Sequence, residues 1–190
     1  LEGTAIPFEY GDLDMLADLL KQHGDQTACI IMEPMRSEMP AAGYLEGVRD
    51  LATRHGVILV FDEVSSGFRV ALGGAQEFLG VTPDLSVFAK AISNGYPMAA
   101  VVGRREVMEP ASRMFISSAY WDDNIGMVAA LTTLRELQRR QAVAHFEWLG
   151  AQFKERIDRA AREVGLEADC VGVAAHPGIR FQVSDPATAK

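Results

Sequence analysis

The sequence is poor in cysteine, in positive charge and in long hydrophobic runs, and each scarcity removes a class of protein. Its 190 residues include only Cys29 and Cys170, so we expect no disulfide framework and a reducing, cytoplasmic setting. The net charge of −8 disfavours nucleic-acid and anionic-membrane partners, because both select a basic face. The apolar runs have strand length, well short of the roughly 20 residues that a membrane helix needs.

Signals for metal binding, secretion and thiol chemistry are equally sparse. The four histidines (His23, His55, His145 and His176) show no metal-ligand spacing, so we expect no metal site. The first residues lack a basic region followed by an apolar core, which argues against a signal peptide. Both cysteines lie among apolar residues and are expected to be small buried side chains.

What is present is an alternation of strand-like and helix-like segments. Helical spacing of leucine and valine predicts helices within 11–24 (capped by Asp12) and 43–56, and a long helical stretch over 125–164 with a break near Gln141 or Gly150. Short apolar runs predict the following strands: 27–33, 57–63, 84–90, 98–103, 114–118, 168–175 and 179–183. The segment 73–80, rich in glycine, is predicted to be a loop.

Strands that are apolar on both faces and alternate with helices indicate an α/β fold with a mainly parallel sheet covered on both sides. In such sheets ligands bind beyond the carboxyl ends of the strands. The polar residues that end strands here are Glu33, Asp62, Glu63 and Lys90. A change of character after about residue 165 divides the chain into two expected units, 1–165 and 166–190.

Asp62 and Lys90 form the pair with the most chemical promise. A desolvated lysine amine can condense with an aldehyde, and a nearby carboxylate can keep a ring nitrogen protonated, which together suits pyridoxal phosphate. The ordinary alternatives remain open at this point. An aspartate at a strand end often caps a turn, and a lysine there often extends to solvent.

The residues around this pair carry a resemblance to a known family. The segments FDEV, GFR, LGGAQE, GVTPDL, NGYP just after Lys90, and GRREVME occur in order between Ala28 and Gly126. They resemble class III (subgroup II) pyridoxal-phosphate-dependent aminotransferases of fold type I, most closely proteins of the glutamate-1-semialdehyde 2,1-aminomutase type. The resemblance implies a partial large domain over 1–165 and the beginning of a small α/β domain over 166–190. Because members of the family are longer, we expect the chain to be a central fragment.

The resemblance also implies roles for individual residues. Lys90 matches the lysine that holds the cofactor as an internal aldimine and later carries a proton between substrate and cofactor. Asp62 matches the partner of the pyridine nitrogen, and Val64 matches an apolar residue packed on the ring. Ser65 follows at a position that often places a polar side chain near the cofactor hydroxyl. Glu38 matches a position near the substrate amine in some members.

One departure concerns the cofactor phosphate. In the family a threonine reaches across a homodimer to the partner's phosphate, but this chain has Ala119 at that position. A serine hydroxyl can donate the same hydrogen bond, so Ser118, or alternatively Ser117, is expected to replace it. Trp121 lies beside this loop. The resemblance thus implies a homodimeric enzyme whose site draws on both subunits.

The activity expected from the resemblance is transamination between a small amine or amino acid and a keto or aldehyde compound. One alternative is an intramolecular 1,2-amino shift of the aminomutase type. Another is a catalytically inactive scaffold, which the loss of the threonine favours. Against the scaffold, Asp62 and Lys90 are intact, and a buried lysine is costly to retain without a use.

Overall fold

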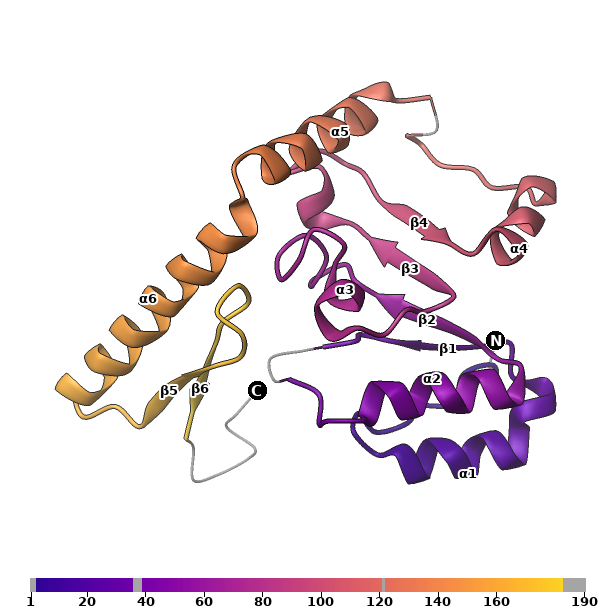
Figure 1. Ribbon diagram of the computed structural model, residues 1–190, viewed down its shortest axis with the longest axis horizontal. Coiled ribbons are helices and arrows are strands. Elements are labelled where there is room, and N and C mark those ends of the chain that lie inside the picture. Colours follow the sequence, from indigo (N-terminus) through magenta and orange to yellow (C-terminus); the bar gives the residue numbers. More distant parts are fainter. Residues whose placement is uncertain (1–2, 36–38, 121, 183–190) are drawn as a thin grey trace.

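The computed structural model describes residues 3–35, 39–120 and 122–182. Figure 1 shows the elements in chain order. The α-helices are α1 (Leu13–His23), α2 (Tyr44–His55), α3 (Ala75–Leu79), α4 (Arg105–Met108), α5 (Asn124–Arg139) and α6 (Ala142–Glu163). The strands are β1 (Cys29–Met32), β2 (Ile58–Asp62), β3 (Leu85–Phe88), β4 (Ala100–Gly103), β5 (Ala168–Val171) and β6 (Gly178–Phe181). Three 3-10 turns complete the set: η1 (Gly24–Gln26), η2 (Lys90–Ile92) and η3 (Glu109–Arg113).

The larger sheet has the order β1-β2-β3-β4. β1, β2 and β3 run parallel, and β4 returns antiparallel to β3. Asp62 at the end of β2 is in register with Val87 of β3, so both strands end at the same edge of the sheet. Figure 1 shows the turns after β2 and β3 side by side at that edge.

One face of this sheet holds the main core. Ile30 and Met32 of β1, with Leu59 and Phe61 of β2, pack against apolar side chains of α1 and α2. Leu59 and Phe61 are fully buried, and burial of such side chains contributes about 2 kcal/mol each. These helices therefore hold β1 and β2 in the register that sets the edge where Asp62 lies.

Local sequence explains where the two covering helices begin and end. The Asp12 side chain accepts a hydrogen bond of 2.8 Å from the Met15 amide, which caps α1 as expected. α2 ends at Gly56, whose φ of +67° is the left-handed conformation that favours glycine at this position. A short connection from Gly56 leads directly into β2.

The opposite face differs from the sequence-based expectation of cover on both sides. Cys29 and Ile31 alternate with the core residues of β1 and are exposed, Ile31 by 62%. Val101 of β4 is 50% exposed. The prediction of a buried thiol is therefore wrong for Cys29, because β1 is an edge strand whose outer face lacks a packed neighbour here. It is confirmed for Cys170.

Two further local predictions are wrong. Segment 114–118 is an exposed coil, with Phe115 exposed by 96%, since no described strand pairs with it. Segment 73–80 is not all loop, because α3 forms between Gly74 and Gly80. The remaining predicted strands and the helices α1 and α2 are present, with shorter bounds.

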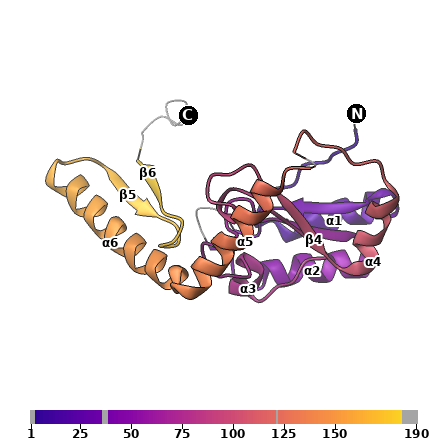
Figure 2. The ribbon, with the colours of Figure 1, turned by 90° about the horizontal axis from the view of Figure 1, so that it is seen from above.

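The C-terminal part of the described chain forms an arm. α5 and α6 meet at Gln141, whose φ of +51° breaks the long helical stretch, while Gly150 lies inside α6. β5 and β6 form an antiparallel hairpin that packs along α6. Figure 2 shows α6 and the hairpin extending away from the larger sheet. Within the described residues, no helix has the length and apolar character needed to cross a membrane.

Candidate functional site

Two predicted site residues meet where β2 and β3 end. Lys90 follows β3 as the first residue of η2, and Ser65 lies in the turn after β2. The Lys90 Nζ donates a hydrogen bond of 2.7 Å to the Ser65 Oγ. The sequence did not predict this contact, because it assigned Ser65 to a cofactor oxygen and not to the lysine.

Lys90 has an unusual backbone. Its φ is +47°, in the left-handed region that a residue with a Cβ seldom adopts. Such strain, of order 1–3 kcal/mol, is often found at functional positions. The Lys90 side chain is exposed, so the burial cost that argued against a scaffold does not apply. The strained backbone still speaks against a scaffold. Glycine would relieve the strain at this position, so keeping a lysine there has a cost in stability.

Asp62 ends β2 with one carboxylate oxygen engaged. Its Oδ1 accepts a hydrogen bond of 2.9 Å from the Val64 amide, which orients the carboxylate along the turn. Within the described parts of the chain, the second oxygen, Oδ2, has no hydrogen-bond donor. Asp62 and Val64 are both half-buried. The site therefore offers an oriented carboxylate with a free oxygen beside an apolar side chain.

Glu63 holds the turn that carries Val64 and Ser65. Its side chain is only 1% exposed. The carboxylate accepts hydrogen bonds from the Ser66 hydroxyl (3.1 Å), the Ala75 amide, and the Gln76 amide and side chain (each 3.2 Å). The Glu63 backbone carbonyl also accepts a bond of 2.8 Å from the Gly67 amide. A buried carboxylate with this many donors fixes the chain on both sides of Ser65.

Two glycines make that arrangement possible. A Cβ on Gly74, whose φ is +83°, would overlap the Glu63 carboxylate. A Cβ on Gly67 would lie 2.6 Å from the Phe88 ring and 2.8 Å from the Glu63 carbonyl oxygen. The carboxylate can approach the start of α3, and the turn can close against β3, only because both positions lack a side chain.

A small hydrophobic cluster supports both sides of the lysine–serine contact. Phe68, three residues after Ser65, packs with Phe88 and with Ile92, which lies two residues after Lys90. The Phe68 and Phe88 ring centroids are 5.0 Å apart. Ala130 of α5 closes the cluster. Because one cluster anchors both turns, their separation is fixed by packing as well as by the hydrogen bond.

The other predicted residues are not brought to Lys90 within this chain. Ser118 lies in the exposed coil before α5, where its hydroxyl accepts a hydrogen bond of 3.2 Å from the Tyr120 amide. Ser117 and Ala119 share that exposed coil. Glu38 and Trp121 lie outside the described residues. The phosphate role of Ser118 stays a prediction.

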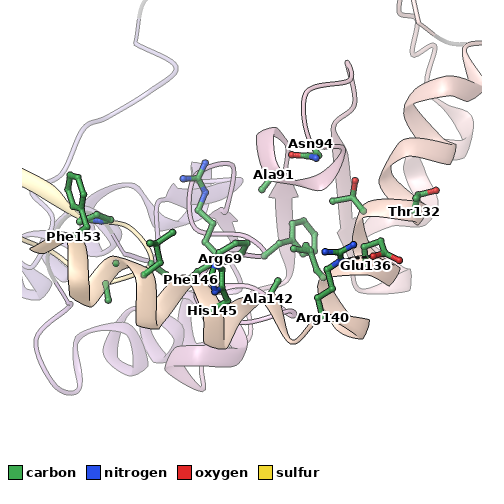
Figure 3. Close-up of a pocket in the computed structure, with 18 residues that line it drawn as sticks. Arg69, Ala91, Asn94, Thr132, Glu136, Arg140, Ala142, His145, Phe146 and Phe153 are labelled. Carbon is green, nitrogen blue, oxygen red and sulfur yellow. Dashed lines mark hydrogen bonds and ion pairs between the residues drawn. The ribbon is translucent and has the colours of Figure 1, made fainter.

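A separate cavity lies between the arm and the site, with a volume of about 1160 Å³ (Figure 3). Its walls come from α5, α6, the turns around Phe68 and Ala91, and the loop between β5 and β6. Glu136 and Arg140 line it and form an ion pair of 2.8 Å. Neither Lys90 nor Asp62 is among its lining residues, so the cavity is a neighbour of the site and not its centre.

Sequence reasoning missed the part played by Glu63, Ser66 and Gln76. Glu63 was recognised only as a residue that ends a strand. The signal that could have revealed more is the spacing from Glu63 to Gly73-Gly74-Ala75-Gln76, where a helix start supplies amide donors. Among the residues that the structure describes, no group of histidine, cysteine, aspartate or glutamate side chains is placed to hold a metal ion.

Comparison with known families matches residues 10–168 to the family described as Aminotransferase class-III. The 3-aminobutyryl-CoA aminotransferase of Cloacimonas acidaminovorans is 40% identical over 182 residues, covering 92% of this chain and 44% of that protein. Glutamate-1-semialdehyde 2,1-aminomutase 2 of Brevibacillus brevis is 39% identical over 175 residues, covering 87% and 41% respectively. The chain thus spans less than half the length of these curated relatives.

Solved structures give the same picture of the fold. The pyridoxal-phosphate internal aldimine form of the FumI protein of Sphingopyxis sp. MTA144 superposes with a TM-score of 0.87 at 29% identity, covering 93% of this chain and 44% of that one. An omega-transaminase from Sphaerobacter thermophilus gives 0.81 at 30% identity, covering 96% and 43%. The predicted α/β fold class, with a mainly parallel sheet and flanking helices, is confirmed.

Proposed function

The chain belongs to the class-III aminotransferase family, and from this we propose that it supplies the lysine of a pyridoxal-phosphate site used for transamination. The amino group would move between an amine or amino acid and a keto or aldehyde compound. The observation that carries the proposal is the placement of the Lys90 amine and the Asp62 carboxylate at the ends of two adjacent parallel strands.

The residues at this edge fit the cofactor chemically. The Asp62 oxygen with no described donor can accept the N–H of a protonated ring nitrogen. The half-buried Val64 offers an apolar surface for a ring and keeps water from the carboxylate. The exposed Lys90 amine donates one hydrogen to Ser65, and in its neutral form its lone pair remains available to attack an aldehyde carbon.

Each residue has a distinct task in the proposed reaction. Bound pyridoxal phosphate supplies the electron-withdrawing ring that makes the carbon of the substrate amine acidic. Asp62 would accept a hydrogen bond from the ring nitrogen and keep it protonated, which would maintain that electron demand. Lys90, as a free amine, would hold and release a proton at its Nζ. Val64 would pack on the ring and limit the access of water to it.

The proposal also covers Ser118, the two domains and the location of the protein. Ser118 would donate its hydroxyl to the cofactor phosphate of the partner in a homodimer, which agrees with its exposed coil and its distance along the chain from Lys90. Residues 1–165 would belong to the large domain and 166–190 would begin the small one. The small number of cysteines supports a cytoplasmic location.

Reductive trapping tests the proposal directly. The purified protein is incubated with pyridoxal phosphate, reduced with borohydride and digested, and the modified lysines are identified by mass spectrometry. The sequence contains only four lysines (Lys21, Lys90, Lys154 and Lys190), so three of them act as internal controls. We expect the pyridoxyl group on Lys90 alone.

A matched variant completes the trapping experiment. Lys154→Gln removes a lysine that bonds to the Gly172 carbonyl on the arm, and it should leave the Lys90 adduct unchanged. Lys90→Gln should abolish the adduct while the protein stays folded. Scattered labelling of all lysines in the wild type would contradict a selective site formed by this chain alone, and the same failure at Lys90 in the complete gene product would favour the scaffold.

A second candidate function is an intramolecular 1,2-amino shift, favoured by the 39% identity to an aminomutase. The two functions differ in whether a free carbonyl compound takes the amino group. Transfer of ¹⁵N from a labelled amine to added pyruvate or 2-oxoglutarate supports transamination. Isomerisation of glutamate 1-semialdehyde with no transfer to either keto acid would favour the amino shift.

A further inference from the structure

We propose that Ser65 is a positioning residue for the free Lys90 amine, and that the buried Glu63 carboxylate holds Ser65 in that place. The inference rests on the proposed function, since it concerns the lysine that would carry the proton. It reassigns Ser65 from the cofactor oxygen that the sequence suggested to the lysine itself.

The first support is the contact between the two side chains. Lys90 Nζ and Ser65 Oγ are 2.7 Å apart, a short distance for a hydrogen bond from an amine. Lys90 has a left-handed backbone, and its side chain reaches the turn after β2. The free amine therefore has a defined position instead of the range of rotamers open to an exposed lysine.

The second support is the chemistry of a hydroxyl partner. A lysine that carries a proton alternates between the ammonium and the neutral amine. A serine hydroxyl accepts a hydrogen bond from either form and can also donate one to the neutral form. A carboxylate at the same place would favour the ammonium and hinder release of the proton. Ser65 can therefore hold the amine through both states.

The third support is the rigidity of the turn. Glu63, two residues before Ser65, is tied to Ser66, Ala75 and Gln76 through its carboxylate. Its backbone amide donates a bond of 2.9 Å to the Val87 carbonyl of β3. Gln76 also donates to the Ser86 hydroxyl of β3 at 2.9 Å. The turn with Ser65 is thus fastened to the strand that leads to Lys90.

The test measures the reactivity of Lys90 in cofactor-free protein. Trinitrobenzenesulfonate arylates neutral amines, and mass spectrometry gives a separate rate for each lysine. One hydrogen bond contributes about 0.5–1.5 kcal/mol, so Ser65→Ala should raise the Lys90 rate by about 3- to 10-fold. Ser65→Thr should restore the wild-type rate, because it keeps the hydroxyl. The rates at Lys21 and Lys154 should not change.

Two controls separate positioning from general loosening of the fold. Ser112→Ala removes an exposed serine hydroxyl that bonds to the Glu109 carbonyl, and it should leave every lysine rate unchanged. The ratio of Lys90 rates between Ser65→Ala and wild type should be the same from pH 7 to 10, since the hydroxyl serves both forms of the amine. Glu63→Gln should raise the Lys90 rate in the same direction.

Binding of pyridoxal phosphate distinguishes the two roles of Ser65. If Ser65 serves Lys90, cofactor affinity in Ser65→Ala should change by less than about twofold. An unchanged Lys90 rate in Ser65→Ala overturns the proposal, whether or not cofactor affinity falls. Because the arylation experiment contains no cofactor, its result is independent of whether the Lys90 adduct forms in the trapping experiment.

Discussion

Each end of the larger sheet has an aspartate, and the two carboxylates differ in burial and in the number of their hydrogen-bond partners. Asp84, just before β3, is 5% exposed, and its carboxylate receives the Leu59 amide (2.8 Å), Arg49 (2.8 Å) and Arg104 (2.9 Å). Asp62, at the far end of β2, is half-buried and has one described donor. Asp84 is saturated with partners, whereas Asp62 keeps an oxygen available. The first end thus has the partners of a structural carboxylate, whereas the second keeps the oxygen that the proposed function uses.

The backbone shows the same division. At the end near Asp84, the left-handed residue next to β2 is a glycine, Gly56, and one carboxylate connects β2, β3 and α2. The end near Lys90 includes left-handed residues at Lys90 and Asn94. Strain of this kind is tolerated where neighbouring packing over-determines it, here through the cluster of Phe68, Phe88 and Ile92.

The largest expected effect is on activity at the Asp62 end. Asp62→Asn keeps the shape but removes the charge that would hold the ring nitrogen protonated. We expect the rate of amino transfer to fall by about 10²- to 10³-fold, as for loss of one preorganised electrostatic contact. The free energy of unfolding should change by less than about 0.5 kcal/mol, because Asp62 is half-buried with one donor. Single-turnover kinetics check the expected rate, and urea unfolding checks the expected stability.

The next effect is on stability at the Asp84 end. Asp84→Ala leaves the Arg49 guanidinium and the Leu59 amide without their acceptor, so the free energy of unfolding should fall by about 3 kcal/mol. The pyridoxyl adduct on Lys90 should still form at low temperature. Arg180→Ala removes an exposed partner of Asp169 and should change stability by less than about 1 kcal/mol. Equal losses of unfolding free energy in Asp84→Ala and Arg180→Ala would contradict a special structural role for the Asp84 end.

Acid should remove the stabilisation that the Asp84 carboxylate provides. Burial alone would raise the pKa of Asp84, but hydrogen bonds from Leu59, Arg49 and Arg104 outweigh it and hold the pKa below the ordinary 3.8. A lowered folded-state pKa means that this stabilisation is complete above the unfolded-state value and is lost as the pH falls below about 4. Urea midpoints between pH 7 and pH 2.5 should fall less in Asp84→Ala than in wild type.

The smallest effect concerns strain at the Lys90 end. Lys90→Gly relieves the left-handed backbone that Lys90→Ala retains. We expect the glycine variant to be more stable than the alanine variant by about 1 kcal/mol. Both variants lose the amine, so the difference isolates the backbone. Thermal unfolding of the pair gives the answer, and a less stable glycine variant would mean that this turn is not strained.

Much of the fold could be predicted because the relevant signals are local. The strand ends at Asp62 and Lys90 follow from apolar runs that stop at a charge, and α1 follows from Asp12 and leucine spacing. Segment 114–118 has the composition of a strand, yet no strand in the described parts of the chain pairs with it, and pairing is a property of the whole sheet. The exposure of Cys29 likewise depends on which face of β1 is covered, which the local sequence does not signal.

The candidate site was predictable in its residues but not in its contacts. Asp62, Val64, Ser65 and Lys90 follow from strand ends and motif resemblance. The Lys90–Ser65 hydrogen bond occurs beside a left-handed backbone at Lys90, and the sequence signals neither, because the residue is not glycine and the two side chains are 25 positions apart. The Glu63 hydrogen bonds require the fold to bring Ala75 and Gln76, which lie 12 and 13 positions further along the chain, to one carboxylate.

The break at Gln141 has a mechanical consequence. A Cβ on Gly150 would overlap the Ala174 carbonyl, so the hairpin loop lies directly on α6, while Val173 and Ala175 of the same loop pack against Met35, Val70 and Ala75. At about 1.5 Å per residue, the 22 residues of α6 form a lever about 33 Å long. A rotation of only about 10° at its fulcrum, Gln141, would carry the far tip through about 6 Å. A small torsional change at one residue would thus displace the end of α6 by more than the spacing between neighbouring strands.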